Sequence, residues 1–331
     1  MRIGETLGQY RIVDVVGQGG MAEVYVGEHE VVQHRVAIKV VHSRHVGDRR
    51  MAQRLIYEAR AVAAIRHPGI VEFYDFGCAD DGRPYIVMEL LQGETLAARL
   101  ERGPLPVDQA VAFARQMASA LGAAHGHGII HRDLKPANIF LVADPDVPFG
   151  ERAKILDFGI AKHITGRREE ITATGMMIGT PAHMSPEQCR GDKEIDGRAD
   201  VYALGVLLFH MVTGKLPFDG LETSEIVSRH LYEQCPAATA VNPAVPETVS
   251  RVIAWCMTKD RQRRCPAMDE LTSALTQVAA AERRNRRASA DAARRRAPSS
   301  SSPVARPSSP AVRASSPAMR PSSPAVRASS P

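Results

Sequence analysis

The sequence HRDLKPAN, at residues 131–138, brings an acid, a lysine and an amide into one short segment. These residue types at these spacings are suited to phosphoryl transfer. The carboxylate of Asp133 can accept a hydrogen bond from an attacking hydroxyl, and Lys135 can neutralise charge on the transferred phosphoryl group. The amide oxygen of Asn138 can ligate a metal ion that bridges phosphates. The segment therefore predicts a phosphoryl-transfer loop, provided that the rest of the chain supplies a nucleotide site.

A glycine-rich turn precedes this loop in the chain. It lies within residues 10–28, between two segments whose apolar residues alternate as they do in β-strands. In the pattern Gly17-x-Gly19-x-x-Ala22-x-Val24, glycine lets main-chain amides approach a polyphosphate because it has no Cβ to block the contact. A hairpin with a flexible turn fits the same pattern, so the turn alone leaves both interpretations open.

Lys39 lies inside an otherwise apolar segment, residues 35–41, that is typical of a strand. A buried ammonium group is costly unless an anion meets it. The alternative is an edge strand from which the lysine reaches solvent while its alkyl chain packs on apolar surface. Residues 54–65 have helical periodicity, and Glu58 in their middle is the natural partner for a buried Lys39.

A second acid, Asp157, lies in a strand-like segment (residues 153–159), 24 residues after Asp133. Two such acids suit a metal–nucleotide site, in which Asp157 holds metal on the phosphates while Asp133 faces the incoming hydroxyl. Residues 160–184 follow without clear periodicity, which indicates a functional or disordered segment. Asp200 then opens an apolar helix.

The composition indicates a soluble globular protein of a reducing compartment. The chain has 331 residues, of which 44% are hydrophobic and 24% are charged. Its five cysteines form no Cys-x-x-Cys pair, which argues against a disulfide framework or a zinc site. The start has no apolar run typical of a signal peptide, and the longest apolar run, residues 201–212, is shorter than the roughly 20 residues of a membrane span. We therefore expect a cytoplasmic protein without a transmembrane segment.

The C-terminal part of the chain is strongly basic. Residues 283–331 carry eleven arginines and one aspartate, a net charge of +10, whereas the rest of the chain has a net charge of −5. Ser-Ser-Pro begins at residues 301, 308, 315, 322 and 329, and a proline in every repeat prevents a continuous helix. The composition predicts disorder. Attachment to nucleic acid, acidic lipid or an acidic partner, phosphorylation of the serines, and a solvated spacer are the alternatives for its role.

In this order, the motifs make the chain similar to the eukaryotic-like protein kinases, and most similar to the bacterial serine/threonine protein kinases. Each motif alone has a real rate of false matches, but their ordered occurrence together is very specific. The resemblance covers about residues 8–280. The motifs that carry it are Gly17 and Gly19 with Val24, Val36-Ala37-Ile38-Lys39, Glu58, residues 131–138, Asp157-Phe158-Gly159, Ser185-Pro186-Glu187 and Asp200.

The resemblance implies an ATP site. Lys39 would bind the α- and β-phosphates and pair with Glu58 in the active state. The gatekeeper position matches Met88. The other nucleotide-binding positions that the resemblance implies are Gly17, Gly19, Val24, Ala37, and the main chain at Glu89 and Leu91.

The resemblance also implies the catalytic and metal-binding residues. Asp133 would be the catalytic acid–base that orients the substrate hydroxyl, and Lys135 would steady the γ-phosphate. Asn138 and Asp157 would hold two magnesium ions, with manganese as the alternative metal.

Regulation by phosphorylation is a further implication. A phosphate on the segment after Asp157 would add about −1.5 to −2 charges and could pair with Arg132, which would order that segment. Thr172 and Thr174 lie where bacterial relatives carry such phosphothreonines, and ordinary solvated threonines are the alternative. Thr180, together with the lysine of the catalytic loop, is similar to the serine/threonine class.

Some positions are structural or depart from the family pattern. Ala22 replaces the third glycine of the glycine-rich loop, and Ser185 replaces the usual alanine before Pro-Glu. By resemblance, Glu187 should pair with Arg264 in a buried salt bridge, and Asp200 should have a structural role.

The fold implied is a bilobal α+β kinase. Residues 1–88 would form a small lobe with an antiparallel sheet and one main helix, residues 89–93 a hinge, and residues 94–281 a larger, mostly helical lobe. The larger lobe would include an activation segment, residues 157–187, and residues 282–331 would be a disordered tail.

The function implied is transfer of the γ-phosphoryl group of ATP to serine or threonine of protein substrates, with autophosphorylation and a role in signal transduction. A homodimer through the small lobe is implied by analogy. The alternatives are a pseudokinase-type scaffold, which would lack a catalytic residue, and a small-molecule kinase of related fold, which would lack the long threonine-bearing segment.

Overall fold

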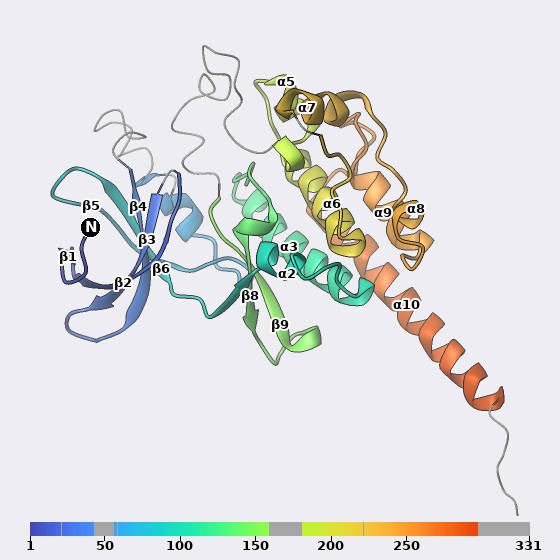
Figure 1. Cartoon of the computed structure of the whole chain (residues 1–331), viewed down its shortest axis with the longest axis horizontal. Coiled ribbons are helices and arrows are strands. Elements are labelled where there is room, and N and C mark those ends of the chain that lie inside the picture. The colour runs from blue at the N-terminus through green and yellow to red at the C-terminus, as the bar shows by residue number, and fades with distance from the viewer. Residues whose placement is uncertain (21, 43–55, 58, 159–180, 221, 297–331) are drawn as a thin grey trace, which may run out of the picture. The chain divides into compact units, whose positions relative to one another are not determined.

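In the computed structural model, the residues described are 1–20, 22–42, 56–57, 59–158, 181–220 and 222–296. The first part of the chain forms an antiparallel six-stranded sheet in the order β1-β2-β3-β4-β6-β5 (Figure 1). Its strands are β1 (Thr6–Leu7), β2 (Tyr10–Gln18), β3 (Ala22–His29), β4 (Arg35–Val41), β5 (Phe73–Cys78) and β6 (Pro84–Glu89).

The strands β4 and β6 consist mostly of buried apolar residues, several of them β-branched. Such residues favour a position inside the sheet, where β4 and β6 lie, rather than at its edges. Ile38 and Val87 face one another in register and are fully buried. On the β4–β6 pair Lys39 lies opposite Ile86, and Lys39 also lies opposite Val24 of β3. The central position of β4 excludes the edge-strand interpretation of Lys39.

Between β4 and β5, the described residues include one helix beside this sheet. Residues 56–57 and 59–63 are helical, and Ala59 and Val62 are buried in one cluster with Ile86 of β6. The predicted small antiparallel sheet with one main helix is therefore confirmed.

The second part of the chain is mostly helical and includes a three-stranded antiparallel sheet in the order β7-β8-β9. The strands are β7 (Gly93–Thr95), β8 (Ile139–Ala143) and β9 (Glu151–Ile155). The α-helices are α2 (Leu96–Leu100), α3 (Val107–Gly126), α5 (Pro186–Arg190), α6 (Arg198–Thr213), α7 (Thr223–Tyr232), α8 (Ala238–Val241), α9 (Glu247–Cys256) and α10 (Met268–Arg296). Short 3-10 helices are η2 (Pro136–Asn138), η3 (Pro148–Gly150) and η4 (Pro181–His183).

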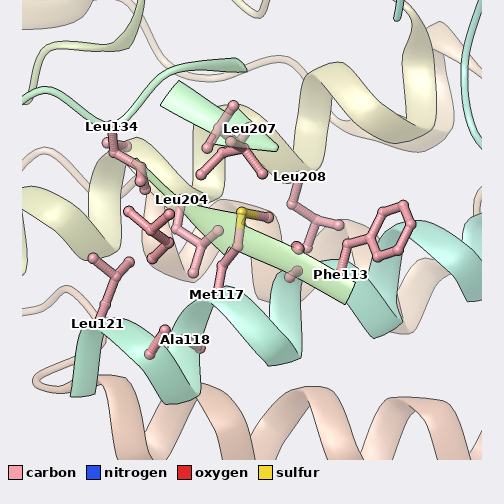
Figure 2. Close-up of a cluster of buried hydrophobic side chains, with 14 of the residues drawn as sticks. Phe113, Met117, Ala118, Leu121, Leu134, Leu204, Leu207 and Leu208 are labelled. Carbon is pink, nitrogen blue, oxygen red and sulfur yellow. The ribbon is translucent and has the colours of Figure 1, made fainter. Parts of the chain in front are cut away.

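Helices α3 and α6 form the centre of the helical part. Nearly every residue of α6 is buried, so it is apolar all round, as expected for a helix enclosed by others. Figure 2 shows Phe113, Met117 and Leu121 of α3 meeting Leu204, Leu207 and Leu208 of α6 in this core. Leu134, which belongs to the sequence HRDLKPAN, lies in the same cluster. The catalytic segment is thus attached to the core by its own leucine.

Two boundaries and one strand differ from the sequence-based expectations. Strand β9 ends at Ile155, so Asp157 lies beyond the strand. Strand β7 was not expected, since three residues are too few to show a period of two. Helix α10 continues to Arg296, past the expected end of the helical lobe at residue 281, because the Ala- and Arg-rich residues 282–296 favour helix and contain neither proline nor glycine.

The chain divides into two compact units, Met1–Arg286 and Arg287–Pro331. Both sheets and the core around α3 and α6 belong to the first unit. Among the residues that the structure describes, no helix has the length and apolar character needed to cross a membrane.

Candidate active site

The segment before Asp133 is anchored by one buried carboxylate. Asp200, in the first turn of α6, is 1% exposed and accepts hydrogen bonds from the main-chain N–H groups of His131 (2.8 Å) and Arg132 (2.9 Å). Its Oδ2 also lies 2.8 Å from Nε2 of His125. Burial alone would raise the pKa of the Asp200 carboxyl, but the hydrogen bonds and the nearby histidines outweigh burial and hold the pKa below its usual value.

His131 links this segment to the chain that follows β9. Its ring Nε2 lies 3.0 Å from the main-chain oxygen of Leu156, and its Nδ1 accepts a hydrogen bond from the main-chain N–H of Asp133 at 3.2 Å. The second contact requires an unprotonated Nδ1, so Nε2 carries the proton. The His131 ring also packs against the ring of Phe158, with centroids 5.0 Å apart. The two acidic segments of the predicted site are therefore held side by side.

Three polar side chains of the sequence HRDLKPAN, those of Asp133, Lys135 and Asn138, converge. Lys135 Nζ lies 2.9 Å from Asp133 Oδ2, and Asn138 Nδ2 donates to the main-chain oxygen of Asp133 at 2.8 Å and to its Oδ2 at 3.2 Å. Leu134 lies in the hydrophobic core (Figure 2). Its neighbours Asp133 and Lys135 stay partly exposed. The arrangement presents a carboxylate, an ammonium and an amide within one small volume.

Asp157, which follows β9, pairs with a lysine of the six-stranded sheet. Its Oδ2 lies 2.6 Å from Nζ of Lys39 on β4. The ion pair therefore connects the six-stranded sheet with the segment that follows β9. The expected partner of Lys39, Glu58, lies outside the described residues. The side chain of Lys39 is only 22% exposed. Burying its ammonium group would be costly, and the nearby carboxylate of Asp157 compensates for this cost.

The backbone of the site is strained at two positions. Arg132 has φ 61° and Asp157 has φ 38°, in the region that L-residues other than glycine rarely adopt. Such conformations persist only where the surroundings enforce them, and they concentrate at functional sites. Arg132 directly precedes the predicted catalytic residue Asp133, and Asp157 is itself a predicted metal-binding residue.

The donor set fits a magnesium-bound nucleotide better than an all-protein metal site. Within the described residues, no group of three or more His, Cys, Asp or Glu side chains is arranged to hold a metal ion. Asp157 and Asn138 offer oxygen atoms, which magnesium prefers, and magnesium commonly binds one or two protein oxygens together with substrate phosphates and water. The residues present therefore fit the predicted cofactor.

Most of the residues predicted to bind nucleotide lie on neighbouring strands of the six-stranded sheet. Gly17 on β2 pairs with Val24 on β3, and Gly19 N–H donates to the Ala22 carbonyl at 2.9 Å, which closes the glycine-rich turn. Ala37 on β4 faces Met88 on β6 in register. The positions that follow Met88 are Glu89, at the end of β6, and Leu91, between β6 and β7.

The side chain of Glu89 is occupied by a contact that the sequence did not suggest. Its Oε2 lies 2.6 Å from Nζ of Lys154 on β9, so this ion pair links the end of β6 with β9. Glu89 can therefore contribute to a nucleotide site mainly through its main chain, which is the contribution the resemblance implied. Sequence reasoning had no means of finding this pair, because its two residues lie 65 positions apart.

Glu187 and Arg264 form a bidentate ion pair with distances of 2.6 and 2.9 Å, and both side chains are buried. Arg264 also donates to the carbonyl oxygens of Thr258 (2.9 Å) and Arg198 (2.8 Å). Burial would raise the pKa of the Glu187 carboxyl, but the hydrogen bonds and charge of Arg264 hold it below its usual value.

A capping box at the start of α5 was missed by the sequence reasoning. Gln188 N–H donates to Ser185 Oγ at 3.4 Å, and Ser185 N–H donates to Gln188 Oε1 at 3.1 Å. The sequence Ser-Pro-Glu-Gln carries the signature of this motif, so the signal was present. Ser185 in place of the family alanine is therefore a helix cap. The expected regulatory residues Thr172, Thr174 and Thr180 lie outside the described residues.

The anchored loop, the acid after β9 and the two-part fold together define a protein kinase. The family model "Protein kinase domain" matches residues 10–275, and the chain belongs to this family. The chain is 41% identical over 281 residues to the serine/threonine-protein kinase Pkn1 of Myxococcus xanthus, with 85% of this chain and 39% of the relative covered. It is 36% identical over 287 residues to PrkC of Bacillus subtilis, with 86% and 43% covered.

Solved structures agree with this assignment. The kinase domain of Mycobacterium tuberculosis PknI superposes with a TM-score of 0.66 at 27% identity, covering 84% of this chain and 99% of that one. The fold is therefore the bilobal kinase fold, and the kinase domain is similar to those of bacterial serine/threonine kinases. The chain spans about two fifths of the length of the curated relatives Pkn1 and PrkC.

Proposed function

We propose that this chain is a serine/threonine protein kinase that transfers the γ-phosphoryl group of ATP to hydroxyl groups of protein substrates. The observation that carries the proposal is the convergence of Asp133, Lys135 and Asn138 on a loop held by Asp200. A scaffold without catalysis would have no need of this arrangement, whose strained backbone carries an energetic cost.

In the proposed reaction, Asp133 accepts the proton of the substrate serine or threonine hydroxyl. The hydroxyl oxygen bonds to the γ-phosphorus, and the bond between that phosphorus and the leaving oxygen of ADP breaks. Lys135, which lies 2.9 Å from Asp133 Oδ2, offsets negative charge on the transferred phosphoryl group. Most of the rate enhancement comes from positioning and from fixed charges.

Asn138 and Asp157 would hold magnesium, with manganese as the alternative. Bound metal supplies positive charge that neutralises the phosphates of the nucleotide. Lys39 would bind the α- and β-phosphates. In the proposed active state Lys39 pairs with Glu58, so its present pair with Asp157 would be exchanged for the new partner.

We extend the proposal to regulation and partners. Autophosphorylation of Thr172 or Thr174 would supply an anion for Arg132, and Thr180 would serve the serine/threonine specificity. The net charge of +10 on residues 283–331 supports attraction of an anionic partner. A homodimer through residues 1–88 and a cytoplasmic location complete the proposal, and light scattering on the purified chain tests the first of these.

The test is mass spectrometry of the purified chain after incubation with ATP and magnesium, with Asp133→Asn as the control variant. We expect mass to be added in steps of one phosphate, to map to Thr172 or Thr174, and to be absent from Asp133→Asn. Phosphate confined to the tail serines would keep the kinase and relocate its regulation. ATP binding without phosphate on this chain or on a generic protein substrate would contradict the proposed activity and favour a scaffold.

A further inference from the structure

Arg132, in the catalytic loop, combines a strained main chain with hydrogen bonds to both of its main-chain polar groups. Its φ of 61° is unfavourable for a residue with a Cβ. Its N–H donates to Asp200 Oδ1 at 2.9 Å, and its carbonyl oxygen accepts a hydrogen bond from Nε2 of Gln188 at 2.8 Å. Two side chains that lie 68 and 56 positions away in the sequence therefore hold the two main-chain groups of one strained residue.

The carbonyl of Arg132 belongs to the same peptide plane as the N–H of Asp133. That N–H donates to Nδ1 of His131 at 3.2 Å. The plane is thus held on one edge by Gln188 and on the other edge by His131. Because a peptide unit is rigid, rotation of this plane would turn the main chain from which the Asp133 side chain projects.

Gln188 has a second contact, at the start of α5. Its Oε1 accepts from the main-chain N–H of Ser185 at 3.1 Å, and its own N–H donates to Ser185 Oγ at 3.4 Å. Ser185 is fully buried, and Glu187 between them is fixed by its ion pair with Arg264. The amide of Gln188 therefore connects a rigid helix start with the catalytic loop, using its oxygen on one side and its nitrogen on the other.

We propose that Gln188 is a positioning residue for the proposed phosphoryl transfer. It holds the carbonyl of Arg132 so that the Asp133 carboxylate keeps the orientation needed to accept the hydroxyl proton. Gln188 touches neither nucleotide nor substrate in this role, and it acts through the Arg132–Asp133 peptide. The proposal rests on the kinase activity proposed above.

The chemistry of the amide provides a selective variant. Gln188→Glu keeps an oxygen that can accept from Ser185 N–H, and glutamate is the usual residue at this position of a capping box. The same change removes the donor to Arg132 and places a carboxylate against a carbonyl oxygen, which is repulsive. The variant should therefore fold normally while losing only the link to the catalytic loop.

Ser185→Ala is the matched control. It removes the hydroxyl that accepts from Gln188 N–H, but both side-chain contacts of Gln188 remain, because the donor on residue 185 is a main-chain group. We expect this variant to lose thermal stability, since a missing cap is destabilising. We expect its kcat to stay within about threefold of the original chain, because the Arg132 carbonyl keeps its partner.

The experiment combines steady-state kinetics on a serine peptide with hydrogen exchange of the catalytic-loop amides, on the original chain, Gln188→Glu and Ser185→Ala. For Gln188→Glu we expect kcat to fall between about 10- and 100-fold. KM for ATP should be nearly unchanged, and exchange should be faster at residues 131–135. For Ser185→Ala we expect the melting temperature alone to change.

Unchanged kcat and unchanged loop exchange in Gln188→Glu would overturn the inference. Equal losses of kcat in both variants would also overturn it, because the effect would then follow from helix α5 and not from the Arg132 carbonyl. If the original chain transferred no phosphate, the proposed function would fail by itself. The exchange measurement would still decide whether Gln188 orders the catalytic loop.

Discussion

Arg264 and Glu187 show how a buried charge is retained in this fold. The pair is fully buried. Removing two ions from water costs several kcal/mol, and their mutual attraction offsets this cost only when the geometry is good and further hydrogen bonds are made. Both conditions are met here, since the pair is bidentate and Arg264 also reaches the carbonyls of Thr258 and Arg198. The pair fixes the start of α5 against the segment before α10.

Removal of one partner should be strongly destabilising. We expect Arg264→Ala to lower the free energy of unfolding by about 3–5 kcal/mol, because Glu187 is left buried without its cation. The double variant Arg264→Met with Glu187→Leu should recover much of this loss, because no buried charge remains. Urea denaturation of the three chains measures both effects. A loss below about 1 kcal/mol in Arg264→Ala would show that the pair is unimportant for stability.

His230 predicts a pH dependence of stability. It is fully buried against Tyr202, whose hydroxyl lies 2.9 Å from its Nδ1, and Lys259 Nζ lies 2.8 Å from its main-chain oxygen. Burial, aided by the charge of Lys259, lowers the pKa of His230 to about 4. The unfolded chain binds this proton near pH 6.5. The unfolded state therefore holds more protons between those values, and stability must fall as the pH falls through this range.

From this histidine alone we expect about 2 kcal/mol to be lost between pH 7 and pH 5. Chemical denaturation at several pH values measures the slope, and His230→Gln, which does not titrate, should have a shallower one. Identical slopes for the two chains would remove His230 as the cause.

At the scale of elements, the short strand β7 makes a close main-chain contact with β8. Gly93 opens β7 with φ 145°, and a Cβ at this position would collide with the main-chain oxygen of Leu141 on β8. β7 begins at Gly93, the last residue of the predicted hinge (residues 89–93), and β8 directly follows η2 of the catalytic loop. The close approach at Gly93 therefore packs the end of the predicted hinge against β8, the strand that follows the catalytic loop.

We expect Gly93→Ala to lower the melting temperature by about 5 °C or more, because it adds both an unfavourable φ and a steric clash. KM for ATP should rise, since Gly93 is the last residue of the predicted hinge. Gly103→Ala is the matched control, because Gly103 has φ 115° but nothing within 4 Å of an added Cβ. The difference between the variants isolates the clash. Equal losses would mean that backbone strain alone matters at both glycines.

At the scale of the whole molecule, charge is divided unequally along the chain. Residues 287–331 form a unit separate from Met1–Arg286 and contain eight arginines and one aspartate. Their net charge is +7, whereas the complete chain has +5. The folded kinase domain is therefore slightly acidic, and basic character belongs to the second unit.

A chain that ends at Arg286 should unfold at nearly the same temperature as the complete chain, within about 2 °C, because its core is intact. It should lose the salt-sensitive retention on immobilised heparin that a strongly cationic segment confers. Thermal unfolding and salt elution test the two parts. A large fall in melting temperature would show that residues after Arg286 support the fold.

Much of the fold followed from local patterns that survive in a single sequence. The strands β2, β3 and β4, the apolar helix α6 and the loop that contains Asp133 were all predicted from periodicity and motif spacing. The predicted end of the last helix was wrong. Arginine occurs both in solvated helices and in disordered tails, so composition alone could not distinguish these two structures. The capping box of Ser185 and Gln188 was missed although its signature is local.

The sequence by itself determined which chemical groups are available and in what order, because residue types and short spacings are properties of the chain. Only the tertiary structure decided which of them meet. The pairs Lys39–Asp157, Glu89–Lys154 and Gln188–Arg132 join residues that lie far apart along the chain. Their proximity depends on how buried surfaces pack, and packing is a property of the complete fold, which no local pattern contains.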